Sequence, residues 1–162
     1  ERMRHIIDGD RITCSGATAA FELILDLIGA RHGQILRLEV ATLFMSAEAG
    51  GQQDAPLARS RSVSRAIAVM QANLETPLAI GEIARQVGRS QKNLEARVQR
   101  ELGVTPQAVY RRLRLILARK HVLETEMAVG EIALRSGYQD ASAMTRAFKA
   151  EFGSSPREMR RR

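Results

Sequence analysis

The chain repeats a short stretch of its own sequence: residues 78–88 read LAIGEIARQVG and residues 127–137 read MAVGEIALRSG. The run Gly-Glu-Ile-Ala and the closing glycine recur 49 positions apart. One extra residue in the second copy then makes the offset 50, which aligns Ser90 with Asp140, Leu94 with Met144, Val98 with Phe148, Leu102 with Phe152, Gly103 with Gly153 and Pro106 with Pro156. The agreement is too long for chance, so residues 63–162 contain an imperfect internal duplication.

Both copies have the same local design. An apolar-periodic helix ends near a glycine that can adopt the positive φ of a tight turn, and Ser90 or Asp140 then caps a second helix of about twelve residues. The second helix is predicted to bury one stripe, formed by Leu94, Val98 and Leu102 in the first copy and by Met144, Phe148 and Phe152 in the second. This is the pattern of a helix-turn-helix, whose second helix commonly enters the major groove of DNA.

A longer helix is predicted between the two copies. It begins at Thr105-Pro106 and runs to about Leu123, with Arg111, Arg112, Arg114, Arg119 and Lys120 outside its apolar stripe. About eighteen residues span about 27 Å. Two recognition helices held that far apart match the spacing of successive major grooves, about 34 Å, on one face of a duplex. The predicted partner is therefore double-stranded DNA.

The charge distribution supports a polyanionic partner. The 162 residues contain 25 Lys and Arg against 18 Asp and Glu, a net charge of +7. Residues 1–57 have 5 basic and 8 acidic side chains, a net charge of −3, whereas residues 58–162 have 20 and 10, a net charge of +10. The positive half would attract a phosphate backbone without reading its sequence.

The composition also indicates which functions are not expected. No apolar run approaches the roughly 20 residues of a membrane span, so no membrane partner is predicted. The single cysteine, Cys14, cannot form an internal disulfide and is expected to be a small buried thiol. The three histidines lack the spacing of metal ligands. We therefore expect no catalytic residue, no metal and no cofactor, in a cytoplasmic protein that is not an enzyme.

The chain is predicted to have two units: residues 1–47, a linker at 48–61 and a DNA-binding domain at 62–162, because residues 46–56 are small and polar. The first unit is expected to contain short strands about an Asp8-Gly9 turn, a helix over 17–31 ended by Gly33, and a second helix from Gln34 to about Met45. These elements are too few to bury their own core, and the chain begins with Glu, so this unit is expected to be the end of a larger domain.

The solvent faces of the two recognition helices supply the candidate base contacts. They are Gln91, Lys92, Asn93, Glu95 and Ala96 in the first helix, and Ala141, Ser142, Thr145, Arg146 and Lys149 in the second. Arg and Lys can pair with guanine, Asn and Gln with adenine, Glu with cytosine, and the methyl groups of Ala and Thr with thymine. The candidate phosphate contacts are Ser90, Arg97, Arg100, Asp140, Arg157 and Arg160. Arg161 and Arg162 would also suit phosphates, although residues 160–162 are expected to form a frayed tail.

Residues 137–149, GYQDASAMTRAFK, followed by FGSSP at 152–156, resemble the signature stretch of AraC/XylS-type transcription regulators. The resemblance implies a mainly α domain of seven helices, in which two helix-turn-helix subdomains share one linking helix. It implies base contacts from Lys92, Glu95, Ser142, Thr145 and Arg146, and RNA polymerase as a partner. In the first copy Ala96 stands where the family often has a base-reading Arg, and Val98 where it usually has Phe. We therefore expect the first helix-turn-helix mainly to contact the DNA backbone.

Residues 10–20, DRITCSGATAA, resemble the end of the glutamine-amidotransferase-like (PfpI-type) domain that precedes the DNA-binding domain in GlxA-type members of the same family. The chain would hold a short α/β remnant of that domain. The implied role of the domain is sensing and dimerisation rather than amide hydrolysis. This resemblance predicts a homodimer of the full-length protein through the N-terminal unit.

The sequence thus predicts a sequence-specific transcription regulator, and an activator in particular. Two alternatives stay open. One is an amidotransferase-like enzyme fragment with a basic accessory domain. The other is a helical RNA- or protein-interaction module, although RNA recognition favours exposed aromatic side chains for stacking, and Phe148 and Phe152 are expected on buried stripes.

Overall fold

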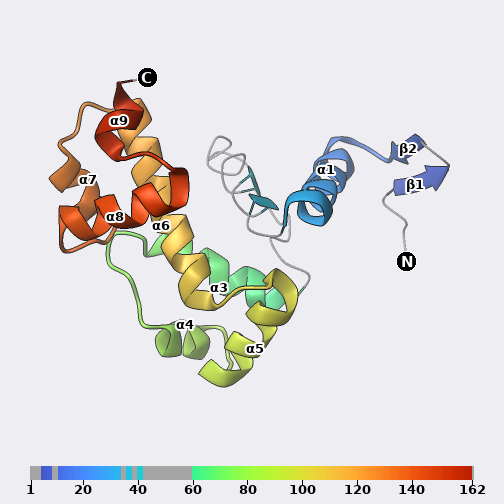
Figure 1. Ribbon diagram of the computed structural model, residues 1–162. Coiled ribbons are helices and arrows are strands. Elements are labelled where there is room, and N and C mark those ends of the chain that lie inside the picture. Colours follow the sequence, from blue (N-terminus) through green and yellow to red (C-terminus); the bar gives the residue numbers. More distant parts are fainter. Residues whose placement is uncertain (1–4, 9–10, 34–35, 38–39, 42–59, 162) are drawn as a thin grey trace. The chain divides into compact units, whose positions relative to one another are not determined.

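The computed structural model describes residues 5–8, 11–33, 36–37, 40–41 and 60–161 (Figure 1). The chain divides into two compact units, Glu1–Leu57 and Ala58–Arg162. The division falls inside the segment that the sequence predicts as a linker, of which only residues 60 and 61 are described. Those two residues already belong to the second unit, because Ser60 caps the helix that begins at Arg61.

The first unit contains a hairpin and a helix. Strand β1 (His5–Asp8) pairs antiparallel with β2 (Arg11–Cys14), and Asp8 lies opposite Arg11. Helix α1 (Ala17–His32) follows and ends at Gly33, which has a φ of +89°. The two strands, the helix and its glycine stop are confirmed. Gly9 of the expected turn lies outside the described residues.

Two further expectations for the first unit have different outcomes. The second helix, expected over 34–45, falls mostly outside the described residues, and the four that are described, 36–37 and 40–41, are helical. The expectation that Cys14 is buried is wrong, because its side chain is exposed at the end of β2. A two-stranded hairpin has no second layer of its own to cover a strand end.

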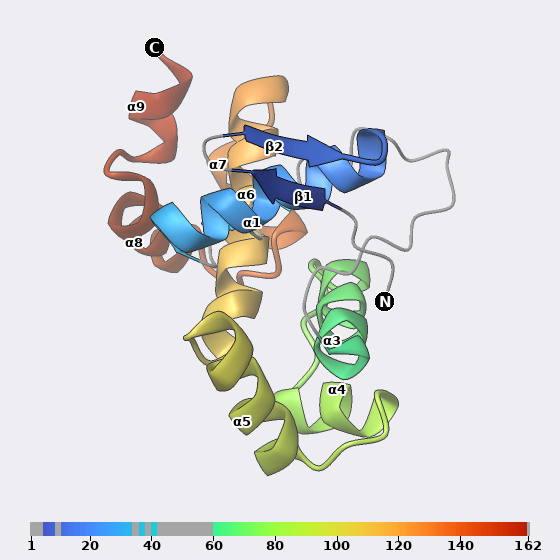
Figure 2. The ribbon, with the colours of Figure 1, turned by 90° about the vertical axis from the view of Figure 1, so that its right-hand side faces the viewer.

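The second unit has seven helices over residues 60–161: α3 (Arg61–Ala72), α4 (Ile80–Gln86), α5 (Gln91–Leu102), α6 (Pro106–Glu124), α7 (Val129–Arg135), α8 (Ala141–Phe152) and α9 (Pro156–Arg160). Figures 1 and 2 show α6 running through the middle of this unit, with α3, α4 and α5 around one end and α7, α8 and α9 around the other. The mainly helical fold, with two subdomains on one linking helix, is confirmed.

The internal repeat is a repeat of structure. Helices α4 and α5 are joined through Gly88, which has a φ of +69°, and α7 and α8 through Gly137, which has a φ of +74°. Each second helix ends at a glycine, Gly103 or Gly153, and a proline then begins α6 or α9. The predicted caps and stops are therefore all in place.

The two recognition helices are capped by different chemistry at equivalent positions. The hydroxyl of Ser90 accepts a hydrogen bond from the backbone N–H of Asn93 (3.3 Å). The two carboxylate oxygens of Asp140 accept from the N–H groups of Ser142 and Ala143, each at 2.9 Å. These backbone hydrogen bonds, the one from Ser142 first, hold the pKa of Asp140 below its ordinary value of 3.8. Asp140 therefore caps α8 as a charged carboxylate.

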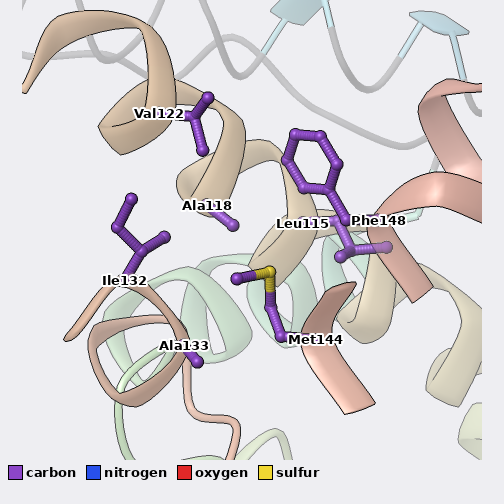
Figure 3. Packing of buried hydrophobic residues seen from close by; sticks show 7 residues of the cluster. All are labelled: Leu115, Ala118, Val122, Ile132, Ala133, Met144 and Phe148. Atoms are coloured by element: carbon purple, nitrogen blue, oxygen red, sulfur yellow. The ribbon is translucent and has the colours of Figure 1, made fainter. Parts of the chain in front are cut away.

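The linking helix contributes to both cores. In the second subdomain, Leu115, Ala118 and Val122 of α6 pack with Ile132 and Ala133 of α7 and with Met144 and Phe148 of α8, all buried. Figure 3 shows the side chains from α7 and α8 pointing toward α6. Leu113 of α6 is also buried but lies outside this cluster, and α6 packs against α3 and α5 as well. One helix is therefore shared by two small hydrophobic cores.

Replacing Phe148 with Ala tests the second core. Phe148 is fully buried (0% exposed), so truncation leaves a cavity and should lower the free energy of unfolding by about 3–5 kcal/mol. Urea unfolding followed by circular dichroism measures the change. The control is Leu134→Ala on α7, where the side chain is 61% exposed and the expected change is within about 0.5 kcal/mol. Equal effects of the two substitutions would contradict this description of the core.

Replacing Asp140 with Ala tests the charged cap. Because the folded pKa lies below that of the unfolded chain, the stabilisation is fully present above the unfolded pKa, about 3.9, and is lost as the pH falls through the folded pKa. We expect Asp140→Ala to melt below the wild type at pH 7, and the gap in Tm to close as the pH falls well below about 3.9.

The matched control for the cap is Ser90→Ala at the equivalent position of α5. A hydroxyl does not titrate in this range, so the loss of about 1 kcal/mol should be independent of pH. Thermal unfolding of both variants over the same pH series measures the comparison. A Tm gap for Asp140→Ala that stays as constant as that for Ser90→Ala would show that the carboxylate charge plays no part in capping.

Candidate nucleic-acid interface

Helix α8 presents a polar stripe opposite its buried one. Ser142, Arg146 and Lys149 are exposed, at the spacing of one helix face. Ala141 and Thr145 border this stripe and are half-buried. All five side chains predicted to contact bases from this helix therefore lie on or beside one accessible face.

Helix α5 presents the equivalent face with different chemistry. Gln91, Lys92, Asn93 and Ala96 are exposed and Glu95 is half-buried. Two polar pairs run along the helix: the amide nitrogen of Gln91 donates to the carboxylate of Glu95 (2.8 Å), and Nε of Arg97 donates to Oδ1 of Asn93 (2.9 Å). These side chains would have to exchange an existing partner for a base or a phosphate.

The offset of 50 shows how the two faces differ. It places Lys92, Ala96 and Gln99 of α5 where α8 has Ser142, Arg146 and Lys149. Gln99 is exposed and was not among the residues predicted from the sequence, although the repeat offset was enough to find it. The first face thus has a methyl group where the second has a guanidinium.

The predicted phosphate contacts divide into two groups. Arg100 at the end of α5 and Arg157 in α9 are exposed. Arg160 instead has its guanidinium on the backbone, where Nε donates to the carbonyl of Val122 (3.3 Å) and Nη2 to that of Met127 (2.8 Å). Arg160 therefore holds the loop between α6 and α7 in place, rather than forming part of a frayed tail; Arg162 lies outside the described residues.

The two caps also differ as phosphate ligands. The hydroxyl of Ser90 is exposed and neutral. The carboxylate of Asp140 is occupied by two N–H groups, and its lowered pKa keeps it negative, which disfavours the phosphate contact expected from the sequence. The positive end of α8 is thus already neutralised by its own cap.

Several arginines of α6 contact side chains of α8 instead of pointing to solvent. Arg112 forms an ion pair with Glu151 of α8. The guanidinium carbons of Arg112 and Arg119 lie 5.6 Å and 5.3 Å from the ring centroid of Phe152, within cation–π range. These contacts fix the recognition helix α8 against the linking helix.

Tyr110 and Arg114 of α6 hold two backbone segments. The hydroxyl of Tyr110 donates to the carbonyl of Asn73 (2.6 Å) and accepts from the N–H of Leu78 (3.2 Å). Burial raises the pKa of Tyr110 above its ordinary value of 10.0, so the hydroxyl keeps the proton that it donates. Arg114 donates from Nε and Nη2 to the carbonyls of Ser136 and Gly137, both at 2.8 Å.

Metal sites, membrane spans and base-stacking surfaces each need a recognisable set of side chains. Within the described part of the chain, no three His, Cys, Asp or Glu side chains are grouped so as to hold a metal ion. None of the described helices is both long enough and apolar enough to cross a membrane. Across residues 60–161 the four aromatic side chains, Tyr110, Tyr138, Phe148 and Phe152, are buried or half-buried, so none forms an exposed stacking platform.

Known proteins share this architecture. A family model described as a helix-turn-helix domain matches residues 83–162. The crystal structure of a transcriptional regulator from Chromobacterium violaceum, described as AraC-type DNA-binding domain-containing, aligns with a TM-score of 0.60 and 32% identity, over 62% of this chain and 89% of that one.

Curated relatives extend the likeness toward the N-terminus. The HTH-type transcriptional regulator GbdR of Pseudomonas aeruginosa is 33% identical over 162 residues, covering 95% of this chain and 44% of that protein. The HTH-type transcriptional regulator GlxA of Rhizobium meliloti is 26% identical over 167 residues, covering 98% of this chain and 52% of that protein. The chain thus spans about half the length of these relatives. With two capped helix-turn-helix units on one linking helix, it belongs to the AraC-type family of DNA-binding transcription regulators.

Proposed function

We propose that this chain binds double-stranded DNA in a sequence-specific manner and activates transcription. One observation carries the proposal: two equivalent, capped helices with exposed polar faces, α5 and α8, sit toward opposite ends of α6. Helix α6 has 19 residues, which corresponds to about 28 Å. That length is close to the roughly 34 Å between successive major grooves on one face of a duplex.

The two helices would divide the work unequally. In α8, Arg146 is suited to guanine, with Ser142, Thr145 and Lys149 beside it, and all of these lie on or next to one accessible stripe. In α5, Lys92 and Glu95 remain the main candidates, but Glu95 would have to exchange Gln91 for a base, Asn93 is paired with Arg97, and Ala96 offers only a methyl group. We expect α8 to supply most of the base discrimination and α5 to contribute more through the DNA backbone.

The N-terminal unit is proposed to be the end of an amidotransferase-like sensor domain. The match to GlxA covers 98% of the chain and so extends into residues 1–47, and the hairpin followed by a helix is an α/β arrangement. Through this unit the full-length protein would form a homodimer. We expect RNA polymerase to be a further partner of the full-length protein. The protein would be cytoplasmic, and it would regulate transcription rather than catalyse a reaction.

Salt dependence tests the electrostatic part of the proposal. If the net +10 half of the chain contacts about six phosphates, affinity for duplex DNA should fall about a thousandfold between 50 and 200 mM salt. An electrophoretic titration at several salt concentrations measures the slope of the logarithm of the binding constant against the logarithm of the salt concentration. Replacing the exposed Arg157 with Ala should reduce the slope by about one. Binding that is unaffected by salt would rule out counterion release as a source of affinity.

Replacing Arg146 with Ala tests the base-reading part. A bidentate contact to guanine is worth about 1–3 kcal/mol at its own base pair. We expect Arg146→Ala to lose about 5-fold to 150-fold in affinity for the duplex that the wild type selects from a randomised library, with little change on random DNA. Arg157→Ala is the control and should weaken both duplexes alike. Equal losses on the two duplexes for Arg146→Ala would make Arg146 a phosphate contact.

A further inference from the structure

The two helix-turn-helix units touch each other at one glycine. A Cβ on Gly137, in the turn between α7 and α8, would overlap the carbonyl oxygen of Leu74 and lie 2.6 Å from Cγ of Pro77. Leu74 and Pro77 belong to the loop between α3 and α4. The turn of the second helix-turn-helix is therefore packed directly on the loop that leads into the first helix-turn-helix. The contact leaves space for a hydrogen atom but not for a methyl group.

Both sides of this contact are fastened to α6. Tyr110 forms hydrogen bonds with the backbone of Asn73 and Leu78, which lie in the loop on either side of Leu74 and Pro77. Arg114 donates hydrogen bonds to the carbonyls of Ser136 and Gly137 in the turn. The Arg114 guanidinium also lies 4.1 Å from the ring centroid of Tyr138. Tyr110 and Arg114 are four positions apart and so share one face of the helix. One turn of α6 thus holds the two touching segments together.

The repeat shows that a helix-turn-helix does not itself need this contact. Gly88 is the equivalent of Gly137 in the first helix-turn-helix. Its φ is nearly the same, +69° against +74°, and a Cβ there would meet nothing within 4 Å. The turn folds in the same way with open space beside it. The close packing at Gly137 therefore belongs to the junction between the units.

We infer that this junction, formed by Gly137, Leu74 and Pro77 and fastened by Tyr110 and Arg114, fixes the angle between α5 and α8 and so sets the spacing of the two half-sites that the chain binds. The inference rests on the proposed two-groove binding to DNA and adds the residues that set its geometry. Tyr110 and Arg114 are positioning residues, because they act on the recognition helices through backbone segments and have no part in base contacts.

The test uses the two equivalent glycines as a matched pair. The probes are the two-part duplex that the wild type selects from a randomised library, the same duplex with one base pair inserted between its half-sites, and a duplex with the half-site of α8 alone. One base pair shifts the second groove by about 3.4 Å. We expect the wild type to bind the duplex with the insertion at least about tenfold more weakly than the selected duplex, because two rigidly held recognition helices cannot follow the shifted groove.

Gly137→Ala and Gly88→Ala place the same strain on a positive-φ turn, but only Gly137→Ala forces the units apart. Gly137→Ala should bind the selected duplex about tenfold more weakly than the wild type does. Its affinities for the selected duplex and for the duplex with the insertion should differ by no more than about threefold, and its affinity for the half-site duplex should stay within about twofold of the wild-type value. Gly88→Ala should keep the wild-type preference between the spacings. A full spacing preference in Gly137→Ala would overturn the inference.

A second pair keeps the test decisive if Gly137→Ala does not fold, which its circular dichroism spectrum would show. Arg114→Met removes the hydrogen bonds to the turn, and Arg111→Met removes the same charge from an exposed position on α6. Only Arg114→Met should reduce the spacing preference. A wild type that selects no specific duplex would overturn the proposed function itself, whereas one that selects a two-part site yet tolerates the insertion would overturn only the junction.

Discussion

The second unit depends on one helix that is buried on more than one side. Leu113 and Leu115 lie two positions apart on α6 and therefore on different faces, yet their exposed fractions are 1% and 0%. Leu115 packs in the core with α7 and α8, and α6 also packs against α3 and α5. Neither subdomain can separate from this helix without exposing apolar surface. The shared helix is what makes two small subdomains one unit.

The same constraint decides what the arginines of α6 do. With apolar side chains on several faces, the remaining positions lie next to neighbouring helices, where a guanidinium can stack on a ring and donate in its own plane. The guanidinium groups of Arg112 and Arg119 lie over the ring of Phe152, and that of Arg114 lies over the ring of Tyr138. Arg112 also pairs with Glu151, and Arg114 donates to two backbone carbonyls. Part of the positive charge therefore stabilises the fold, whereas Lys92 and Arg100 of α5 and Arg146 and Lys149 of α8 are exposed and available for the proposed DNA contacts.

Much of the fold could be predicted from sequence because it rests on local signals. The caps Ser90 and Asp140, the glycine turns and the proline starts each act within a few residues, and the duplication doubled every signal. The roles of Tyr110, Arg114 and Arg160 could not be predicted, because their hydrogen bonds reach backbone groups 22 to 38 positions away and leave no periodic pattern. For the candidate site, the repeat indicated helix faces that are accessible in the structure, but the pairs Gln91–Glu95 and Asn93–Arg97 could not be predicted because they depend on side-chain conformations.

The proposed binding mode places α5 and α8 in successive major grooves on one side of a duplex. Hydroxyl-radical footprinting of the chain on its selected duplex tests this most directly, because it maps protected sugars along each strand. We expect two protected patches on the same face, with centres about one helical turn, or about 10 to 10.5 base pairs, apart. A single protected patch no wider than one groove, or two patches on opposite faces of the duplex, would contradict it.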